Sequence, residues 1–247
     1  MLLGLILGDG SGAGSAACIS IRLRIERSLV AVPADMLHTL ALIVGWLAAG
    51  LSCFISAPQL VRIVRAGTTS GVSMLAWQMA LGGNITWGMY GIVHGNPNQW
   101  VPNVLLVTIT LIILGLFRRH VGTPWPVLIL PGLILAATTT SLDRWVGPIA
   151  FSIAAFLPAA VSLVSQLRTT AGSDDVTGLS LGNQWIGLTN QSVWLLWAVL
   201  VGNQQVLLVG SMALVLIVAN VSLATLRKNG TWGPVRREGL RLSVSRA

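Results

Sequence analysis

Seven long apolar runs constrain this chain more than any other feature of its sequence. The runs cover residues 37–62, 73–93, 99–117, 122–142, 145–167, 178–201 and 204–226. About 20 apolar residues in a helix cross the roughly 30 Å of hydrocarbon in a bilayer. Helices are expected rather than strands, because lipid offers no partner for unpaired backbone groups and Val206–Ala219 lacks the alternating polarity of a barrel strand. The sequence therefore predicts an all-α membrane protein with seven transmembrane helices.

The distribution of charge predicts the orientation. Only 9% of the 247 residues are charged, against about 25% in soluble domains. The basic residues behind the net charge of +8 sit in short loops and in the tail, which is typical of a membrane topology signal and argues against a nucleic-acid partner. With the N-terminus outside, the cationic residues that fall inside are Arg62, Arg65, Arg118, Arg119, Arg168, Arg227, Lys228, Arg236, Arg237, Arg241 and Arg246. The outer loops then hold only Arg144, so we expect a multi-pass plasma-membrane protein with a cytoplasmic C-terminus.

An offset of 107 residues relates the two halves of the chain. The residues that it aligns are Trp87 with Trp194, Tyr90 with Trp197, Gly95 with Gly202 and Asn96 with Asn203. Three spans per copy is an odd number, so one extra span is needed between the copies if both are to run in the same direction. The sequence thus predicts two parallel three-helix bundles joined by a linker helix, a 3+1+3 plan.

The expected organisation has five segments. They are a poorly structured or non-native N-terminal extension at 1–35, a first repeat at 36–120, a linker helix at 121–143, a second repeat at 144–228 and a basic cytoplasmic tail at 229–247. The first boundary depends on Met36, which stands directly before the first good span. It also depends on the basic residues before Met36, because a signal peptide carries its positive charge ahead of its apolar stretch and here the order is reversed.

A proline–glutamine pair, Pro58-Gln59, lies near the cytoplasmic end of the first span. Proline there removes one backbone hydrogen bond and kinks the helix at a defined position. The segments that follow are Gly71-Val72-Ser73, then Trp87-Gly88-Met89-Tyr90-Gly91, then Asn103. This series resembles the PQ-loop superfamily and, within it, the SWEET and SemiSWEET (MtN3/saliva) sugar transporters. The resemblance covers residues 37–120 well and residues 145–228 weakly.

The resemblance implies a sugar pocket lined by a tryptophan on the second helix and an asparagine sixteen positions later, which are Trp87 and Asn103 here. An indole face packs against the C–H surface of a sugar, and an amide exchanges hydrogen bonds with its hydroxyls. Trp194 holds the tryptophan position of the second repeat, whereas Gly210 replaces the asparagine. The structural alternatives are an interfacial role for Trp87 and an interhelical hydrogen bond for Asn103.

Two further groups of residues complete the predicted site. The additional candidates for the pocket are Asn84, Tyr90, Asn190, Gln191, Trp197 and Ser211. The candidate hinges are Pro58, Gln59 and Pro158. We expect no metal, no cofactor and no enzymatic activity, because the sequence has no cluster of His, Cys, Asp or Glu and no Gly-rich phosphate loop before a helix.

The resemblance implies facilitated diffusion of a small neutral solute, a mono- or disaccharide, by alternating access. Proton coupling is not expected, because no Asp, Glu, Lys or Arg falls in the middle of a predicted span. A non-transporting PQ-loop receptor or sensor and a carrier of amino acids or another small metabolite are the alternatives. The expected partners are the solute and the lipid bilayer, and association into a homo-oligomer is left open.

Overall fold

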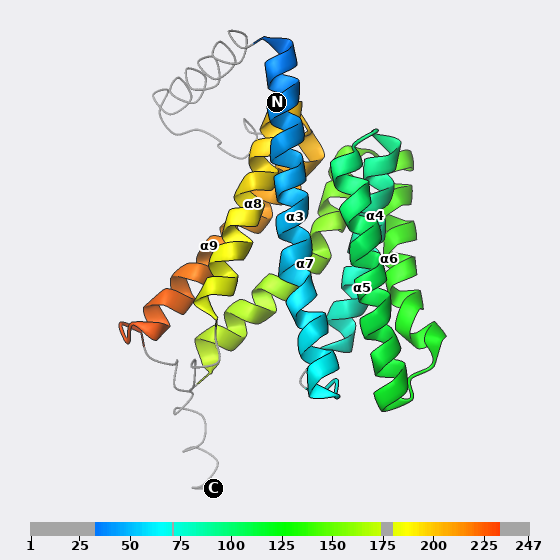
Figure 1. Cartoon of the computed structure of the whole chain (residues 1–247), viewed down its shortest axis with the longest axis vertical. Coiled ribbons are helices and arrows are strands. Elements are labelled where there is room, and N and C mark those ends of the chain that lie inside the picture. The colour runs from blue at the N-terminus through cyan, green and yellow to red at the C-terminus, as the bar shows by residue number, and fades with distance from the viewer. Residues whose placement is uncertain (1–32, 71, 174–179, 233–247) are drawn as a thin grey trace, which may run out of the picture. The chain divides into compact units, whose positions relative to one another are not determined.

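The described part of the chain consists of α-helices. The computed structural model describes residues 33–70, 72–173 and 180–232, and no strand occurs within these ranges. The helices are α3 (Ala34–Ala66), α4 (Met74–Val93), α5 (Pro97–Val121), α6 (Trp125–Trp145), α7 (Pro148–Gly172), α8 (Leu181–Val201) and α9 (Gln204–Lys228) (Figure 1). Each corresponds to one predicted span, with ends that differ by a few residues. The all-α prediction is confirmed, whereas most of the predicted extension at 1–35 and of the predicted tail at 229–247 lies outside the described residues.

Five of these helices are both long and apolar enough to cross a membrane. They are Asp35–Ala66, Pro97–Val121, Trp125–Trp145, Pro148–Gly172 and Gln204–Lys228. The other two, α4 and α8, have sufficient length at 20 and 21 residues but carry more polar side chains, among them Gln78, Asn84, Asn190 and Gln191. The chain is therefore a multi-pass helical membrane protein whose two most polar long helices are α4 and α8.

The helix ends repeat along the chain at the offset of 107 residues. This offset carries α5 onto α9 end for end, and the start of α4 onto the start of α8. The N-caps correspond as well, because the Ser73 hydroxyl accepts a hydrogen bond from the Ala76 amide and the Ser180 hydroxyl accepts one from the Asn183 amide. Glycines with a left-handed backbone, φ 66° at Gly95 and 67° at Gly202, follow both helices.

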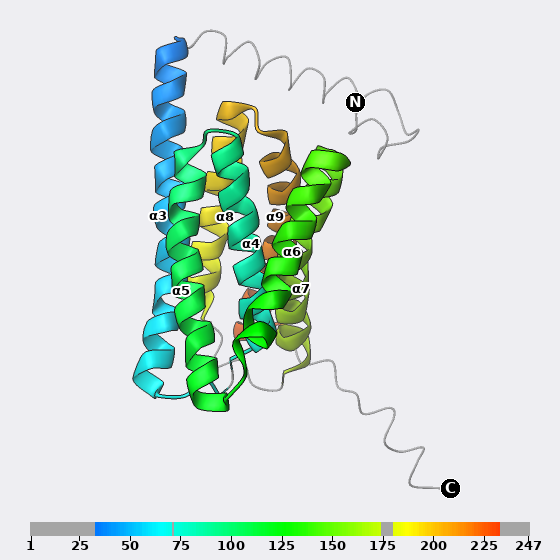
Figure 2. The same cartoon turned by 90° about the vertical axis from the view of Figure 1, so that its right-hand side faces the viewer.

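Neighbouring helices define two groups. In one, α4 packs against both α5 and α6; in the other, α9 packs against both α7 and α8 (Figures 1 and 2). Contacts of α6 and α4 with α7 connect the groups. A core around Leu81, Ile113 and Leu128 joins α4, α5 and α6, and Ile63 near the end of α3 packs into it.

Two glycines allow α4 and α6 to lie in close contact. A Cβ built on Gly82 would be 2.7 Å from the carbonyl oxygen of Gly132, and one built on Gly132 would be 2.6 Å from the carbonyl oxygen of Gln78. Any larger residue would push the two backbones apart. Small residues serve this purpose in membranes, where association depends on close packing rather than on the hydrophobic effect.

A side-chain amide compensates for the proline within α6. Pro131 has no N–H, so the carbonyl of Val127, four residues earlier, loses its partner within the helix. The Gln78 side chain of α4 donates Nε2–H to this carbonyl, with an N···O distance of 2.6 Å. The polar residue on α4 therefore satisfies a backbone group that would otherwise be unpaired in a low-dielectric environment.

Arg227 closes the C-terminal end of α7. Its guanidinium is buried and donates to the carbonyl oxygens of Thr170 and Ala171, each at 2.9 Å, and to that of Ser173. The last carbonyls of a helix lack intrahelical partners and carry partial negative charge, which a cation stabilises. The arginine at the end of α9 thus fixes the end of α7.

Candidate functional site

Trp87 lies within a cluster of aromatic rings. Its indole meets the rings of Tyr90 and Phe151 edge to face, with centroid distances of 5.6 and 5.5 Å. Tyr90 and Phe151 stack on each other at 5.1 Å, and Ala155 and Val209 complete the buried part of the cluster. Trp87 itself is only half-buried. This cluster therefore joins α4 to α7 and leaves part of the Trp87 surface free.

Trp194 has an equivalent partner on α3. Its indole N–H donates to the Ser52 hydroxyl at 3.0 Å, and the Asn190 Oδ1 lies 3.2 Å from the same hydroxyl, which donates to it or to the Ala48 carbonyl. The Trp194 and Trp197 rings meet edge to face at 5.6 Å. Ser52 therefore links two predicted site residues of α8 to α3, although its sequence context does not distinguish it from other serines.

The two predicted pocket tryptophans come together on one apolar cluster. Trp197, Ala198 and Val206 form its buried part, and both Trp87 and Trp194 pack against it. One tryptophan comes from α4 and the other from α8, the two helices that correspond at the offset of 107 residues. The structure thus brings together two residues that are far apart in the sequence.

Asn103 is positioned on α5 beside the Trp87 region of α4. A Cβ built on Gly88, the residue after Trp87, would lie 3.4 Å from the Asn103 Cβ. The Asn103 Nδ2 donates to the carbonyl of Gln99 one turn earlier, at 2.7 Å. The side chain is half-buried, so its amide oxygen remains as an acceptor next to the aromatic cluster.

Several candidate pocket residues have structural partners. The Asn84 Nδ2 donates to the Thr110 hydroxyl at 3.3 Å, and the buried Tyr90 hydroxyl donates to Asn203 Oδ1 at 3.2 Å. The His94 ring stacks on Tyr90, with a centroid distance of 3.9 Å. Trp197 is 2% exposed and belongs to the core, whereas Ser211 is exposed on α9.

Packing around Gly45 brings a residue that the sequence did not single out to this region. A Cβ on Gly45 would lie 2.8 Å from Trp197 Nε1 and in contact with Asn98 Nδ2. Asn98 is 3% exposed, and its Nδ2 has no hydrogen-bond partner among the described residues. Only contact between α3, α5 and α8 reveals this amide, because its position early in α5 otherwise suggests an ordinary helix-end residue.

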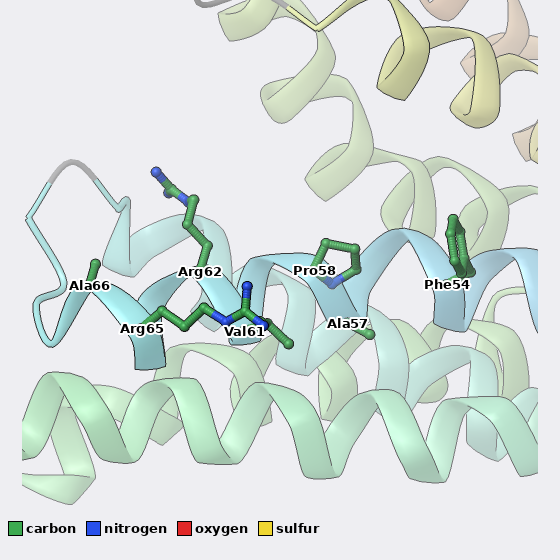
Figure 3. A pocket seen from close by; sticks show the side chains of 7 residues that line it. All are labelled: Phe54, Ala57, Pro58, Val61, Arg62, Arg65 and Ala66. Atoms are coloured by element: carbon green, nitrogen blue, oxygen red, sulfur yellow. The ribbon is translucent and has the colours of Figure 1, made fainter.

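The predicted hinges lie away from the tryptophans. Pro58 is exposed on α3 and Gln59 is half-buried, while Pro158 is half-buried in the middle of α7. An open groove of about 740 Å³ runs along α3 beside Pro58 (Figure 3). Its lining residues are Phe54, Ala57, Pro58, Val61, Arg62, Arg65 and Ala66. None of the three predicted pocket residues contributes to this groove.

The chemical character of the tryptophan region is neutral. Its polar groups are amides, hydroxyls and indole N–H groups, and no group of three or more His, Cys, Asp or Glu residues that could hold a metal occurs within the described ranges. Such an arrangement can exchange hydrogen bonds with an uncharged polar molecule and pack aromatic rings against its apolar surface.

Comparison with known proteins identifies the family. The PQ loop repeat matches residues 40–100, which include Pro58, Gln59 and Trp87. The sugar transporter SemiSWEET of Escherichia coli (strain UMEA 3162-1) is 30% identical over 81 residues, which make up 32% of this chain and 91% of that protein. Relatives of this kind carry solutes across membranes, so the chain is a transport protein rather than an enzyme. It belongs to the PQ-loop superfamily and, within it, to the SWEET and SemiSWEET family of membrane transporters.

Proposed function

We propose that the protein is a uniporter that moves a small neutral sugar, a mono- or disaccharide, down its concentration gradient. The observation that carries this proposal is the pairing of Trp87 and Trp194 on one apolar cluster, with neutral hydrogen-bonding side chains beside them. The name of the SemiSWEET relative gives the solute class. An amino acid would call for charged partners, and the polar side chains bonded around these tryptophans are neutral.

The proposed architecture is the 3+1+3 plan, with repeats at 36–120 and 144–228 and a linker at 121–143. The end-for-end correspondence of α5 with α9 supports it, as do the matching serine caps of α4 and α8. Cross-contacts support it too, because Trp87 of α4 meets Phe151 of α7 while Trp194 of α8 meets Ser52 of α3. In each case the second helix of one repeat faces the first helix of the other.

The proposed mechanism is alternating access around a site formed by Trp87, Asn103 and Trp194. The indole faces pack on the C–H surface of the sugar, and the Asn103 amide oxygen accepts a hydroxyl proton in a hydrogen bond. The bent helices α3 and α7 rock about Pro58 and Pro158, with the Gln59 amide pairing with backbone groups that the α3 kink frees. Repeats related in this way present their shared site to one side of the membrane and then to the other.

Uptake of radiolabelled sugars into proteoliposomes tests the proposal. We expect wild-type protein to equilibrate the sugar across the membrane, with and without a protonophore, because the charged residues of the described helices lie near helix ends. The Trp87→Ala, Asn103→Ala double variant should lose at least about tenfold in uptake rate, since it removes a stacking surface and a hydrogen bond. Equal uptake by wild type and double variant would contradict the site, and absence of wild-type uptake would contradict the function.

A further inference from the structure

The contact between the second and third helix of each repeat pairs a small residue with a large one, and the two repeats exchange their positions. In the first repeat, Gly88 of α4 faces Asn103 of α5. The equivalent residues of the second repeat are Leu195 of α8 and Gly210 of α9. A Cβ built on Gly210 would lie 2.8 Å from Leu195 Cδ2, so here the glycine is on the third helix. The loss of the asparagine at 210 is thus matched by a gain of bulk at 195.

A second amide occupies the space beside Gly210. The Gln191 Nε2 would lie 2.9 Å from a Cβ at position 210, so an asparagine there could not coexist with this glutamine conformation. Gln191 is half-buried, and its side-chain amide has no hydrogen-bond partner within the described ranges. Its donor and acceptor therefore remain free for another molecule.

The other polar side chains near this contact are accounted for. The Asn190 Oδ1 lies within hydrogen-bond distance of the Ser52 hydroxyl, and Ser211 is exposed on α9. Asn84, which is the residue equivalent to Gln191 in the first repeat, donates to Thr110 of α5. In the first repeat the amide at this position ties α4 to α5, and the amide of the third helix stays available. In the second repeat the roles are exchanged.

We propose that Gln191 supplies the substrate-binding amide of the second repeat, in the place that Asn103 takes in the first. This inference rests on the proposed sugar transport and adds a specificity-determining residue to it. The sugar lies between an amide on the third helix of one repeat and an amide on the second helix of the other. The site is therefore complete in hydrogen-bonding groups but asymmetric in geometry, which favours solutes whose two ends differ.

The test compares uptake kinetics in proteoliposomes. Gln191→Met keeps the length of the side chain and removes its amide, and we expect KM for the transported sugar to rise about 3- to 10-fold, the loss expected for one or two hydrogen bonds. The Gln191→Leu variant provides the same test if the methionine variant folds poorly, as judged by thermal unfolding in detergent. Thr189→Val, an exposed polar-to-apolar change two residues away on α8, serves as the matched control and should leave KM unchanged.

A rescue variant separates substrate contact from packing. Gln191→Met, Leu195→Gly, Gly210→Asn recreates on α8 and α9 the pair found on α4 and α5, and we expect it to restore KM to within about threefold of wild type. Wild-type KM in a folded Gln191→Met protein would overturn the assignment of Gln191 while leaving the transport function intact. Absence of uptake by the wild type would overturn the transport function and this inference with it.

Discussion

At the scale of single residues, the largest demands on this fold fall on glycines that allow helices to touch. Gly45 on α3 has no space for a side chain, because a Cβ would lie 2.8 Å from the Trp197 indole. Gly50, five residues later on the same helix, has no atom within 4 Å of its Cβ position. Two glycines that look alike in the sequence therefore have different physical roles.

We expect Gly45→Ala to lower the free energy of unfolding by about 1–3 kcal/mol, the usual cost of overpacking a well-filled contact. Gly50→Ala should leave it unchanged or raise it by up to about 1 kcal/mol, because alanine favours the helix. Thermal unfolding of both variants in the same detergent measures the difference. Equal shifts in the two transition temperatures would contradict the packing described around Gly45.

The sequence identified part of the candidate site. Tryptophan and asparagine are rare enough in an apolar chain for the spacing of Trp87 and Asn103 and the repeated Trp194 to be noticed. Ser52 was missed, and Gln191 could not be separated from Asn190 and Ser211. These assignments depend on which side chains lie opposite one another, and periodicity within one helix carries no information about the residues of its neighbours.

At the scale of helices, length was predictable and contact was not. The bilayer thickness determines how long an apolar run must be, so the predicted spans agree with the observed helices to within a few residues. The close contact of α4 with α6 through Gly82 and Gly132 did not follow from the sequence, since many of its 27 glycines lie in apolar runs. Nor did the pairing of Gln78 with the carbonyl left free by Pro131.

This pairing predicts energetic coupling between Gln78 and Pro131. Gln78→Leu should cost about 1–3 kcal/mol of stability, because it leaves the Val127 carbonyl unsatisfied inside the fold. In a Pro131→Ala background the same change should cost less than about 1 kcal/mol, since the new N–H at position 131 can bond that carbonyl. A double-mutant cycle of unfolding free energies measures the coupling. An identical cost in both backgrounds would show that Gln78 acts through something other than this carbonyl.

At the scale of the whole described chain, charge separates the two ends of the helices. Basic residues near the C-terminal ends of α3, α5 and α9 are Arg62, Arg65, Arg118, Arg119, Arg227 and Lys228. Consecutive helices are joined by short connections, so these ends share one side of the bundle. The end of α6 and the start of α3 lie toward the opposite side, where Asp35 and Asp143 offset the charge of Arg144. Basic ends favour the cytoplasmic side, so the charge pattern favours a cytoplasmic C-terminal end of α9.

Labelling of single cysteines in intact cells tests this orientation. In a background with Cys18 and Cys53 replaced by serine, a cysteine at Asn229, the exposed C-cap of α9, should react with a membrane-impermeant maleimide only after the membrane is opened. A cysteine at Val146, the C-cap of α6 and 68% exposed, should react without opening. Each site serves as the control for the other, because both follow a helix end and neither requires a left-handed backbone. Reaction of Asn229→Cys in sealed cells together with protection of Val146→Cys would reverse the orientation, and a basic end facing outward would mean that a stronger signal than these arginines directs insertion.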